Sequence, residues 1–354
     1  MRKHTLYLLN FLLVLAVILS GFISPAHAQT TTPTAVVVTL EGPLTPVWSG
    51  QLQRGIDRAE RDNADLLVIE LNTPGGSVDL MNSLIQQILA SPVPVVVYVS
   101  PRGSMAASAG TLIVLAGQIG AMSPESSIGA ASPVGMQGED IETTVEEKTK
   151  EILKASARSL AERRGAEAIQ LVEEAIDSAV AASSTEALQA GLIDIIARDL
   201  DDLLAQVDGL TVSVNGEDVV IRSSGAEVVP IAPTLVEEIL GMLTNPNIVF
   251  ILLSIGVQAI LIEISSPGGW VAGTIGVILL ALAIYGLGIL PVNWFGIVFF
   301  IIAFILFIFD IKAPTHGAFT IAGVASFITG ALILFNSALV PGFPRVSVGL
   351  VVGM

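Results

Sequence analysis

Four long apolar runs fill most of the C-terminal part of the chain. They are Ile248–Ile262, Gly269–Leu290, Trp294–Phe309 and Gly317–Phe335. A helix needs roughly 17–25 apolar residues to cross a bilayer, so the second and fourth runs suffice alone and the other two need flanking residues. The pattern therefore predicts about four transmembrane helices over residues 244–338. The tail, residues 339–354, begins another apolar run and stops, as a truncated fifth span would.

The first 28 residues have the pattern of a secretory signal peptide. Arg2 and Lys3 precede a mostly apolar stretch over residues 5–23, and Ala26-His27-Ala28 matches an A-x-A cleavage site. An uncleaved anchor helix is the competing interpretation. Because either segment would export the domain after it, we expect a multi-pass protein of the cell membrane whose soluble domain is extracytoplasmic.

Residues 29–223 alternate between strand-like and helix-like patterns, which is typical of an α/β domain with a parallel sheet. The predicted strands and helices, in order, are Ala35–Leu40, Val47–Arg61, Asp65–Leu71, Ser77–Ala90 and Val93–Val99. A helical stretch over residues 142–206 and a hairpin at Asn215-Gly216 come next. Residues 224–243 are predicted to be a linker that ends in a short amphipathic piece, Leu235–Leu243, suited to the membrane interface.

Charge and composition exclude several classes of function for this protein. Of 354 residues, 52% are hydrophobic and 14% charged, and residues 29–243 carry 30 acidic and 12 basic residues, a net charge of −18. Such a domain has no basic surface for nucleic acid. The absence of cysteine excludes a thiol nucleophile, disulfides and cysteine zinc sites. The histidines, His4, His27 and His316, lie outside the predicted soluble domain, so a Ser-His-Asp triad is excluded there. We expect no metal and no cofactor.

Ser108 is the candidate nucleophile. It comes after the strand Val93–Val99 and precedes Thr111–Ala116, an apolar, helix-compatible segment. The N-terminus of such a helix favours negative charge nearby, and the small residues around Ser108 leave room for a substrate backbone. The alternative, which this segment alone slightly favours, is an N-cap serine in a tight helix–sheet contact.

The loop Pro74-Gly75-Gly76 favours a catalytic role for Ser108 over a role as a helix N-cap. It also comes directly after a parallel strand, and ligand sites in open α/β sheets gather at that edge. Adjacent glycines can present N–H groups to an oxyanion without obstruction by side chains. An ordinary glycine turn is the alternative, and the same tripeptide recurs at Pro267-Gly268-Gly269 in the membrane block.

A lysine is the remaining base that could activate a serine in this domain. The domain has three: Lys148, Lys150 and Lys154. Helical spacing puts Lys150 and Lys154 on one row near several glutamates, which is typical of solvated ion pairs. Lys148 instead extends a less polar face with Ile152. From spacing alone, a catalytic Lys148 and a solvent-exposed Lys148 are about equally supported.

Three soluble motifs, in this order, resemble the long NfeD family, membrane-bound serine proteases of the ClpP class that are also called stomatin-operon-partner proteases. The motifs are Asn72-Thr73-Pro74-Gly75-Gly76, Gly103-Ser104-Met105-Ala106-Ala107-Ser108-Ala109-Gly110 and Ile128-Gly129-Ala130-Ala131-Ser132-Pro133-Val134. In the membrane block, Leu290–Gly296 and His316-Gly317 resemble the same family. The resemblance runs from about residue 34 to the end.

The resemblance implies a ClpP/crotonase-like α/β domain and, after it, an all-α multi-span membrane domain. It implies a dyad of Ser108 and Lys148, because Lys148 holds the place of the family lysine on the helix that leads to Ser159-Leu160-Ala161. Gly76 and Ala109 would give the oxyanion N–H groups, with Gly75 as the alternative to Gly76. The implied partners are a stomatin-like membrane protein and further copies of this chain, as a homodimer or higher homo-oligomer. The family commonly ends in a small β-barrel, and this sequence stops before one.

We therefore expect a membrane-tethered serine endopeptidase that cleaves apolar segments of membrane-associated proteins. A non-enzymatic membrane scaffold that binds partner proteins is the alternative. The two are distinguished by whether Ser108 reacts with a serine-directed probe.

Overall fold

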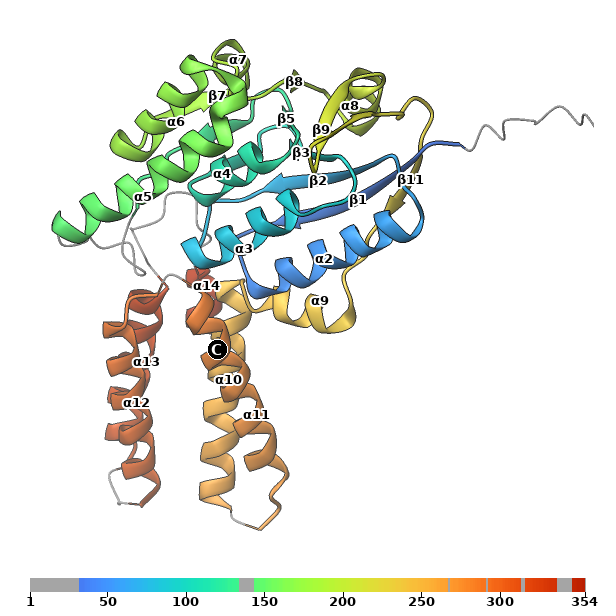
Figure 1. The fold of residues 1–354 in the computed structure, drawn as a ribbon. Coiled ribbons are helices and arrows are strands. Elements are labelled where there is room, and N and C mark those ends of the chain that lie inside the picture. Colours follow the sequence, from blue (N-terminus) through green and yellow to red (C-terminus); the bar gives the residue numbers. More distant parts are fainter. Residues whose placement is uncertain are drawn as a thin grey trace, which may run out of the picture. The chain divides into compact units, whose positions relative to one another are not determined.

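The computed structural model describes residues 32–133, 143–266, 268–290, 292–312, 316–335 and 346–353 (Figure 1). The predicted signal peptide lies outside these residues. An α/β domain comes first in the chain and apolar helices come after it. The expected architecture, an α/β domain ahead of a helical membrane block, is therefore confirmed.

A six-stranded, fully parallel sheet forms the centre of the α/β domain, with the strand order β11-β1-β2-β3-β5-β8. The strands that were predicted are β1 (Thr34–Glu41), β2 (Leu66–Asn72) and β3 (Val95–Val99). The predicted helices between them are α2 (Pro46–Arg61) and α3 (Val78–Leu89). Apolar runs of this kind form strands that are buried on both faces, and every residue of β3 is indeed buried.

Each face of the sheet packs on its own apolar cluster. Alternate strand residues such as Val36, Leu67 and Val97 share the larger cluster with α2, α3 and the helices α4 (Ala109–Ala116), α5 (Thr143–Ala161) and α6 (Ala166–Ser178). Their neighbours in sequence face the other side, where α8 (Leu200–Val207) covers them. Ser108 directly precedes α4, so it belongs to the side of the larger cluster.

A second, three-stranded sheet holds the segment before Ser108. It contains β4 (Met105–Ala107), β6 (Ser127–Gly129) and β7 (Ala181–Ser183), in the order β4-β6-β7. A single bridge joins Thr73, just beyond β2, to Ala106 of β4. The small sheet thereby connects the glycine loop after β2 to the residues before α4.

The segment predicted as one helical stretch, 142–206, is interrupted. After α6 the chain forms β7, α7 (Ser184–Gln189) and β8 (Ile195–Ile196) before α8 begins. Strand β5 (Ile119–Met122) lies between β3 and β8 in the large sheet. The predicted hairpin is present as β9 (Thr211–Val214) and β10 (Glu217–Val220), which pair antiparallel.

The segment predicted as a linker also contains ordered elements. Strand β11 (Glu227–Pro230) pairs in parallel with β1 and forms one edge of the large sheet. Helix α9 (Leu235–Met242) comes next, with Thr234 and Glu237 in a reciprocal capping box. Residues 224–243 therefore complete the α/β domain and are not a free tether.

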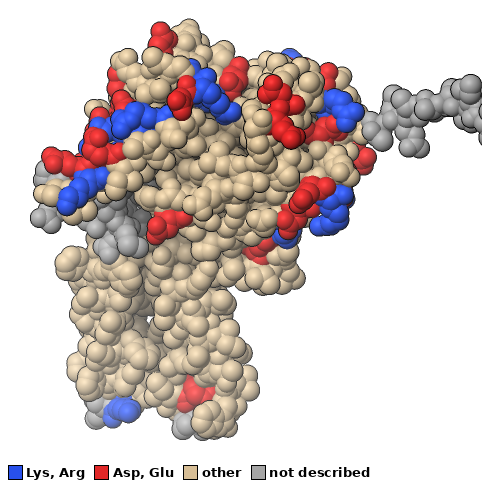
Figure 2. Space-filling model, viewed as in Figure 1, with Lys and Arg blue, Asp and Glu red and all other residues tan. Residues whose placement is uncertain are grey.

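The membrane block contains three helices that are long and apolar enough to span a bilayer, among the residues that the structure describes. They are α10 (Pro246–Ser265), α11 (Val271–Ile289) and α12 (Phe295–Lys312). The fourth predicted span corresponds to α13 (Ala318–Leu334), a shorter apolar helix of 17 residues, and α14 (Val348–Gly353) lies in the tail. Figure 2 shows this block almost free of charged side chains on the face in view, whereas the α/β domain carries many.

Candidate active site

Ser108 sits at a sharp turn between β4 and α4. Its backbone has φ 54° and ψ −121°, in a region that side-chain-bearing residues rarely occupy. The Ser108 N–H donates to the carbonyl of Gly129 at 2.8 Å, and the Thr111 N–H donates to the carbonyl of Ser108 at 3.0 Å. Such backbone strain costs about 1–3 kcal/mol and is concentrated at functional sites. The turn makes Ser108 more than an ordinary N-cap, whose backbone is extended and whose side chain bonds the helix.

Thr111 holds this turn from inside the domain. Its side chain is fully buried, and its Oγ1 accepts the Gly129 N–H at 3.0 Å. The same hydroxyl lies within donating distance of the carbonyls of Ala106, at 3.0 Å, and Gly129, at 3.2 Å. One side chain therefore links β4, β6 and α4 around Ser108.

The glycine loop passes directly over Ser108. Gly75 has φ 110°, and a Cβ placed on it would lie 2.7 Å from the Ser108 Cβ and 3.1 Å from its Oγ. The loop is fixed by hydrogen bonds from Thr73 N–H to the Met105 carbonyl at 2.7 Å and from Ala107 N–H to the Thr73 carbonyl at 3.0 Å. Because no side chain fits there, glycine is needed at position 75 for a close approach as well as for backbone freedom.

The glycine loop and the start of α4 contain both engaged and unengaged backbone N–H groups among the described residues. The Gly75 N–H is engaged, since it donates to Thr73 Oγ1 at 3.0 Å. No hydrogen bond from the N–H of Gly76 or of Ala109 occurs within the described part of the chain. Between the two glycines that the sequence left open, Gly76 is therefore the one with a free donor.

The three lysines of the domain all lie on α5, and two of them are engaged as predicted. Lys150 pairs with Glu146 at 2.7 Å and donates to the Asp177 carbonyl at 3.1 Å. Lys154 pairs with Glu151 at 2.5 Å and with Asp177 at 3.2 Å, and the hydrogen bond to Glu151 is the main cause that raises the pKa of Lys154.

Helix α5 turns a different face inward from the one expected for Lys148. The buried positions are Leu153, Ala157 and Ala161, whereas Lys148 is exposed and Ile152 is 69% exposed. Lys150 and Lys154 instead contact Asp177 at the end of α6. Among the described residues, no hydrogen bond or ion pair joins Lys148 to Ser108, so the structure does not bring the two together.

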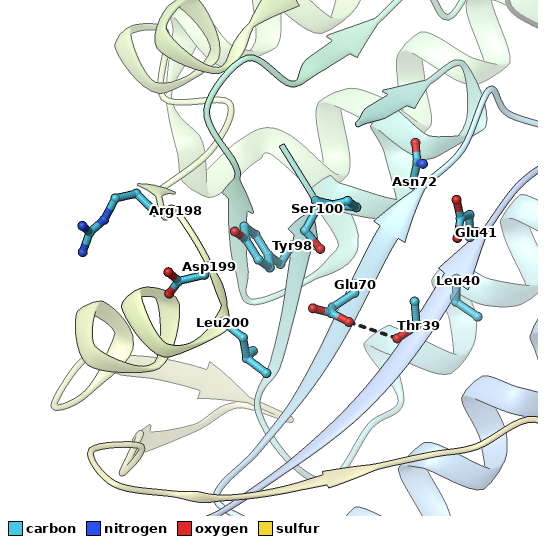
Figure 3. A pocket seen from close by; sticks show the side chains of 11 residues that line it. Thr39, Leu40, Glu41, Glu70, Asn72, Tyr98, Ser100, Arg198, Asp199 and Leu200 are labelled. Carbon is cyan, nitrogen blue, oxygen red and sulfur yellow. Dashed lines mark hydrogen bonds between the residues drawn. The ribbon is translucent and has the colours of Figure 1, made fainter. Parts of the chain in front are cut away.

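A cavity of about 310 Å³, which sequence reasoning missed, opens at the carboxyl edge of the sheet, on the face that α8 covers (Figure 3). Alternate residues near the ends of β1, β2 and β3 supply one part of its polar lining: Thr39, Glu41, Glu70, Asn72 and Ser100. Arg198 and Asp199, just before α8, supply another part. In the sequence, polar residues occupy every second position at the ends of these otherwise apolar strands. That alternation was the signal from which the cavity could have been predicted. In the same wall the hydroxyl of Tyr98 donates to the Ala197 carbonyl at 2.9 Å, and burial raises the pKa of Tyr98 to about 12.

Comparison with protein families identifies both parts of the chain. The NfeD1b N-terminal domain matches residues 35–211, and the NfeD integral membrane domain matches residues 247–354. The membrane-bound protease PH1510 of Pyrococcus horikoshii is 38% identical over 305 residues, which are 85% of this chain and 68% of that protein. The membrane protein NfeD1b of Bacillus subtilis is 27% identical over 318 residues, 88% of this chain and 69% of that protein.

Solved structures agree with these matches. The 1510-N membrane-bound stomatin-specific protease, as a lysine-to-alanine mutant in complex with a substrate peptide, superposes with a TM-score of 0.55. It is 33% identical, covering 60% of this chain and 98% of that one. A serine-to-alanine mutant of the same protease gives a TM-score of 0.54 at 36% identity, covering 58% of this chain and all of that one.

The fold, the serine turn and the apolar helices together define a membrane protein with a protease-type α/β domain. The chain belongs to the NfeD family, and it is a membrane protease of that family.

Proposed function

We propose that this protein is a serine endopeptidase in which Ser108 is the nucleophile and Lys148 is the base. The observation that carries the proposal is the strained Ser108 turn, at the N-terminus of α4 and beneath Gly75, next to the free N–H groups of Gly76 and Ala109. This arrangement supports a site in which a nucleophile and oxyanion donors act together, as acyl transfer requires.

The chemistry uses these groups in turn. The neutral amine of Lys148 takes the proton of the Ser108 hydroxyl as Oγ attacks a peptide carbonyl. The N–H groups of Gly76 and Ala109 hold the oxyanion of the tetrahedral intermediate. Lys148 then gives its proton to the leaving amine as the peptide bond breaks and the acyl-enzyme forms. Water, deprotonated by the same lysine, hydrolyses the ester and restores Ser108.

The choice of Lys148 rests on its free side chain. In the relative 1510-N, the mutated lysine lies 41 positions after the mutated serine. Here Lys148 lies 40 and Lys150 lies 42 positions after Ser108, so this spacing favours neither. Lys150 is engaged by Glu146 and by the Asp177 carbonyl, whereas no such partner engages Lys148 within the described residues. Catalytic hydrogen bonds are often formed only once substrate is bound, which accounts for the separation of Lys148 and Ser108 here.

The substrate we propose is an extended, apolar segment of a membrane-associated protein. Ser108 is flanked in the chain by Ala107 and Ala109, and Gly75 passes over it. These residues are small and apolar, which supports the close approach of a peptide backbone. The net charge of −18 disfavours acidic peptides. A stomatin-like protein is the candidate substrate, because the relative 1510-N is described as stomatin-specific.

A fluorophosphonate probe on the full chain in detergent micelles tests the proposal. We expect wild-type protein and Ser104→Ala to be labelled, and Ser108→Ala to be unlabelled and inactive on an apolar peptide. Ser104 is a matched control because it is a buried serine of the same motif. Labelling of Ser108→Ala that is lost in Ser104→Ala would move the nucleophile to Ser104. No labelling of wild type under any condition would favour the scaffold function.

A further inference from the structure

Helix α9 presents an exposed apolar face. Four residues of its eight are apolar and between 43% and 71% exposed: Leu235, Val236, Ile239 and Met242. Their spacing places them along one side of the helix. A contiguous apolar surface of this kind marks a contact with a protein or with lipid.

The other side of α9 is fixed to the α/β domain. Helix α9 lies beside α2 (Figure 1). Glu237 forms an ion pair with Arg54 of α2, and Arg54 also donates to the Ala232 carbonyl at 3.2 Å. Glu237 accepts the Thr234 N–H at 2.7 Å as well, which completes the capping box. One carboxylate therefore caps α9 and holds it to α2, and we call this contact the Arg54–Glu237 clamp.

Chain connectivity places α9 next to the bilayer. Only three residues separate Met242, the end of α9, from Pro246, the start of α10. Four Cα steps span at most about 14 Å. Because α10 is long and apolar enough to cross a membrane and lies almost wholly in the matched NfeD membrane domain, α9 must lie within or beside the headgroup layer.

We propose that α9 lies in the membrane surface, with Leu235, Val236, Ile239 and Met242 inserted at the boundary between headgroups and acyl chains. The partner is lipid, and the contact is apolar and not electrostatic. Residues 223–311 contain no lysine or arginine, so a basic patch for anionic lipid is absent from this part of the sequence. Neutral lipid should therefore suffice.

The contact changes how the catalytic domain is held. A free linker of about twenty residues would let the domain range over about 25 Å. Strand β11 belongs to the sheet and α9 is held to α2 by the clamp. The chain between β11 and α9 is only residues 231–234, so no long flexible linker remains. The domain is therefore docked on the bilayer at a fixed height.

Site-directed spin labelling tests the lipid contact, because the natural sequence has no cysteine to remove. Val236→Cys and Ile239→Cys would be labelled with a nitroxide in the full chain, one copy per phosphatidylcholine nanodisc. The matched control is Val220→Cys on β10, where valine is 57% exposed against 63% for Val236. We expect the labels on α9 to collide more with oxygen and less with an aqueous nickel chelate than the control does.

Two outcomes would overturn the lipid contact. Labels at positions 236 and 239 as accessible to the nickel chelate as the label at 220 would put α9 in water. Protection from both reagents would mean that protein covers α9. Neither readout needs peptidase activity, so the lipid contact and the proposed peptidase chemistry are tested independently of each other.

The clamp has its own test in the same nanodiscs. Arg54→Ala should increase the mobility of the label at 220 by releasing the domain from α9, while the α9 labels stay in lipid. Arg58→Ala is the matched control on α2, since within the described residues Arg58 forms an ion pair with Asp62, four positions further along the chain, and with no other residue. Equal effects of the two substitutions would show that the clamp does not hold the domain.

Discussion

At the scale of single residues, the site depends on a glycine that has no room for a side chain. We predict that Gly75→Ala lowers activity by roughly a hundredfold or more, because its Cβ would push Ser108 or the loop out of place. Gly103→Ala is the matched control: Gly103 also has positive φ, but no atom lies within 4 Å of a Cβ there. Steady-state peptide cleavage by the two variants would measure the difference, and equal losses would show that backbone strain alone matters.

The second prediction for single residues concerns Lys148 as the proposed base. Lys148→Ala should be as damaging as Ser108→Ala, and the double variant should be no worse than either, since the two residues act as one unit. Lys150→Ala and Lys154→Ala are matched controls on the same helix and should be mild, because those side chains pair with acids at the surface. A Lys150→Ala variant that loses more activity than the Lys148→Ala variant would contradict the assignment of Lys148 as the base.

At the scale of elements, Tyr98 joins β3 to the segment before α8. Tyr98→Phe removes its hydrogen bond to the Ala197 carbonyl and leaves that buried acceptor unpaired, so we expect a loss of about 1–3 kcal/mol in the free energy of unfolding. Urea unfolding, monitored by the fluorescence of buried Trp48, would measure it. Tyr285→Phe, in a membrane helix, is the control and should leave this transition unchanged.

The pKa of Tyr98 predicts how this element responds to alkaline pH. Burial is the first cause that raises the pKa from 10.0 to about 12, so the folded state holds the phenolic proton more tightly than the unfolded state. The stabilisation is fully present below pH 10 and declines as the pH rises from about 10 to 12. Tyr98→Phe should remove this decline, and an unchanged decline would assign it to another group.

The elements also show what sequence patterns can and cannot predict. Strands β1, β2 and β3 were predicted nearly to their ends, because continuous apolar runs between turns are a strong signal. Strands β4 and β11 were missed, since three or four residues give no periodicity and their pairing partners lie far away in sequence. The approach of Gly75 to Ser108 depends on β4 and was therefore unpredictable in detail.

Helix α5 is the element whose buried face was predicted wrongly. Its sequence has apolar residues on two faces, with Ile152 on one and Leu153 on the other, so spacing could not decide which face is buried. In the folded domain the buried face is that of Leu153, Ala157 and Ala161, which pack in an apolar cluster formed mostly by other elements. The residues of the candidate site were thus identified by type and motif, whereas their side-chain environment required the tertiary structure.

At the scale of the whole molecule, we predict that the α/β domain is extracytoplasmic. With four spans after it, the loop carrying Lys312 would face the cytoplasm, as the positive-inside rule favours. Alkaline phosphatase fused after residue 243 should be active, and a cytoplasmic reporter fused there should be silent. The opposite pair of results would overturn both the predicted signal peptide and the topology.

The pairing of β11 with β1 also constrains how the protein is made. The strand at the edge of the sheet is the last to be synthesised, and it joins the first. Until Pro230 emerges, β1 exposes an unpaired edge, which is a template for association with other chains. The first membrane helix begins at Pro246, so 15 residues of chain separate the strand that completes the sheet from the first membrane helix. The edge of β1 therefore stays unpaired until nearly all of the chain before the membrane block has been made.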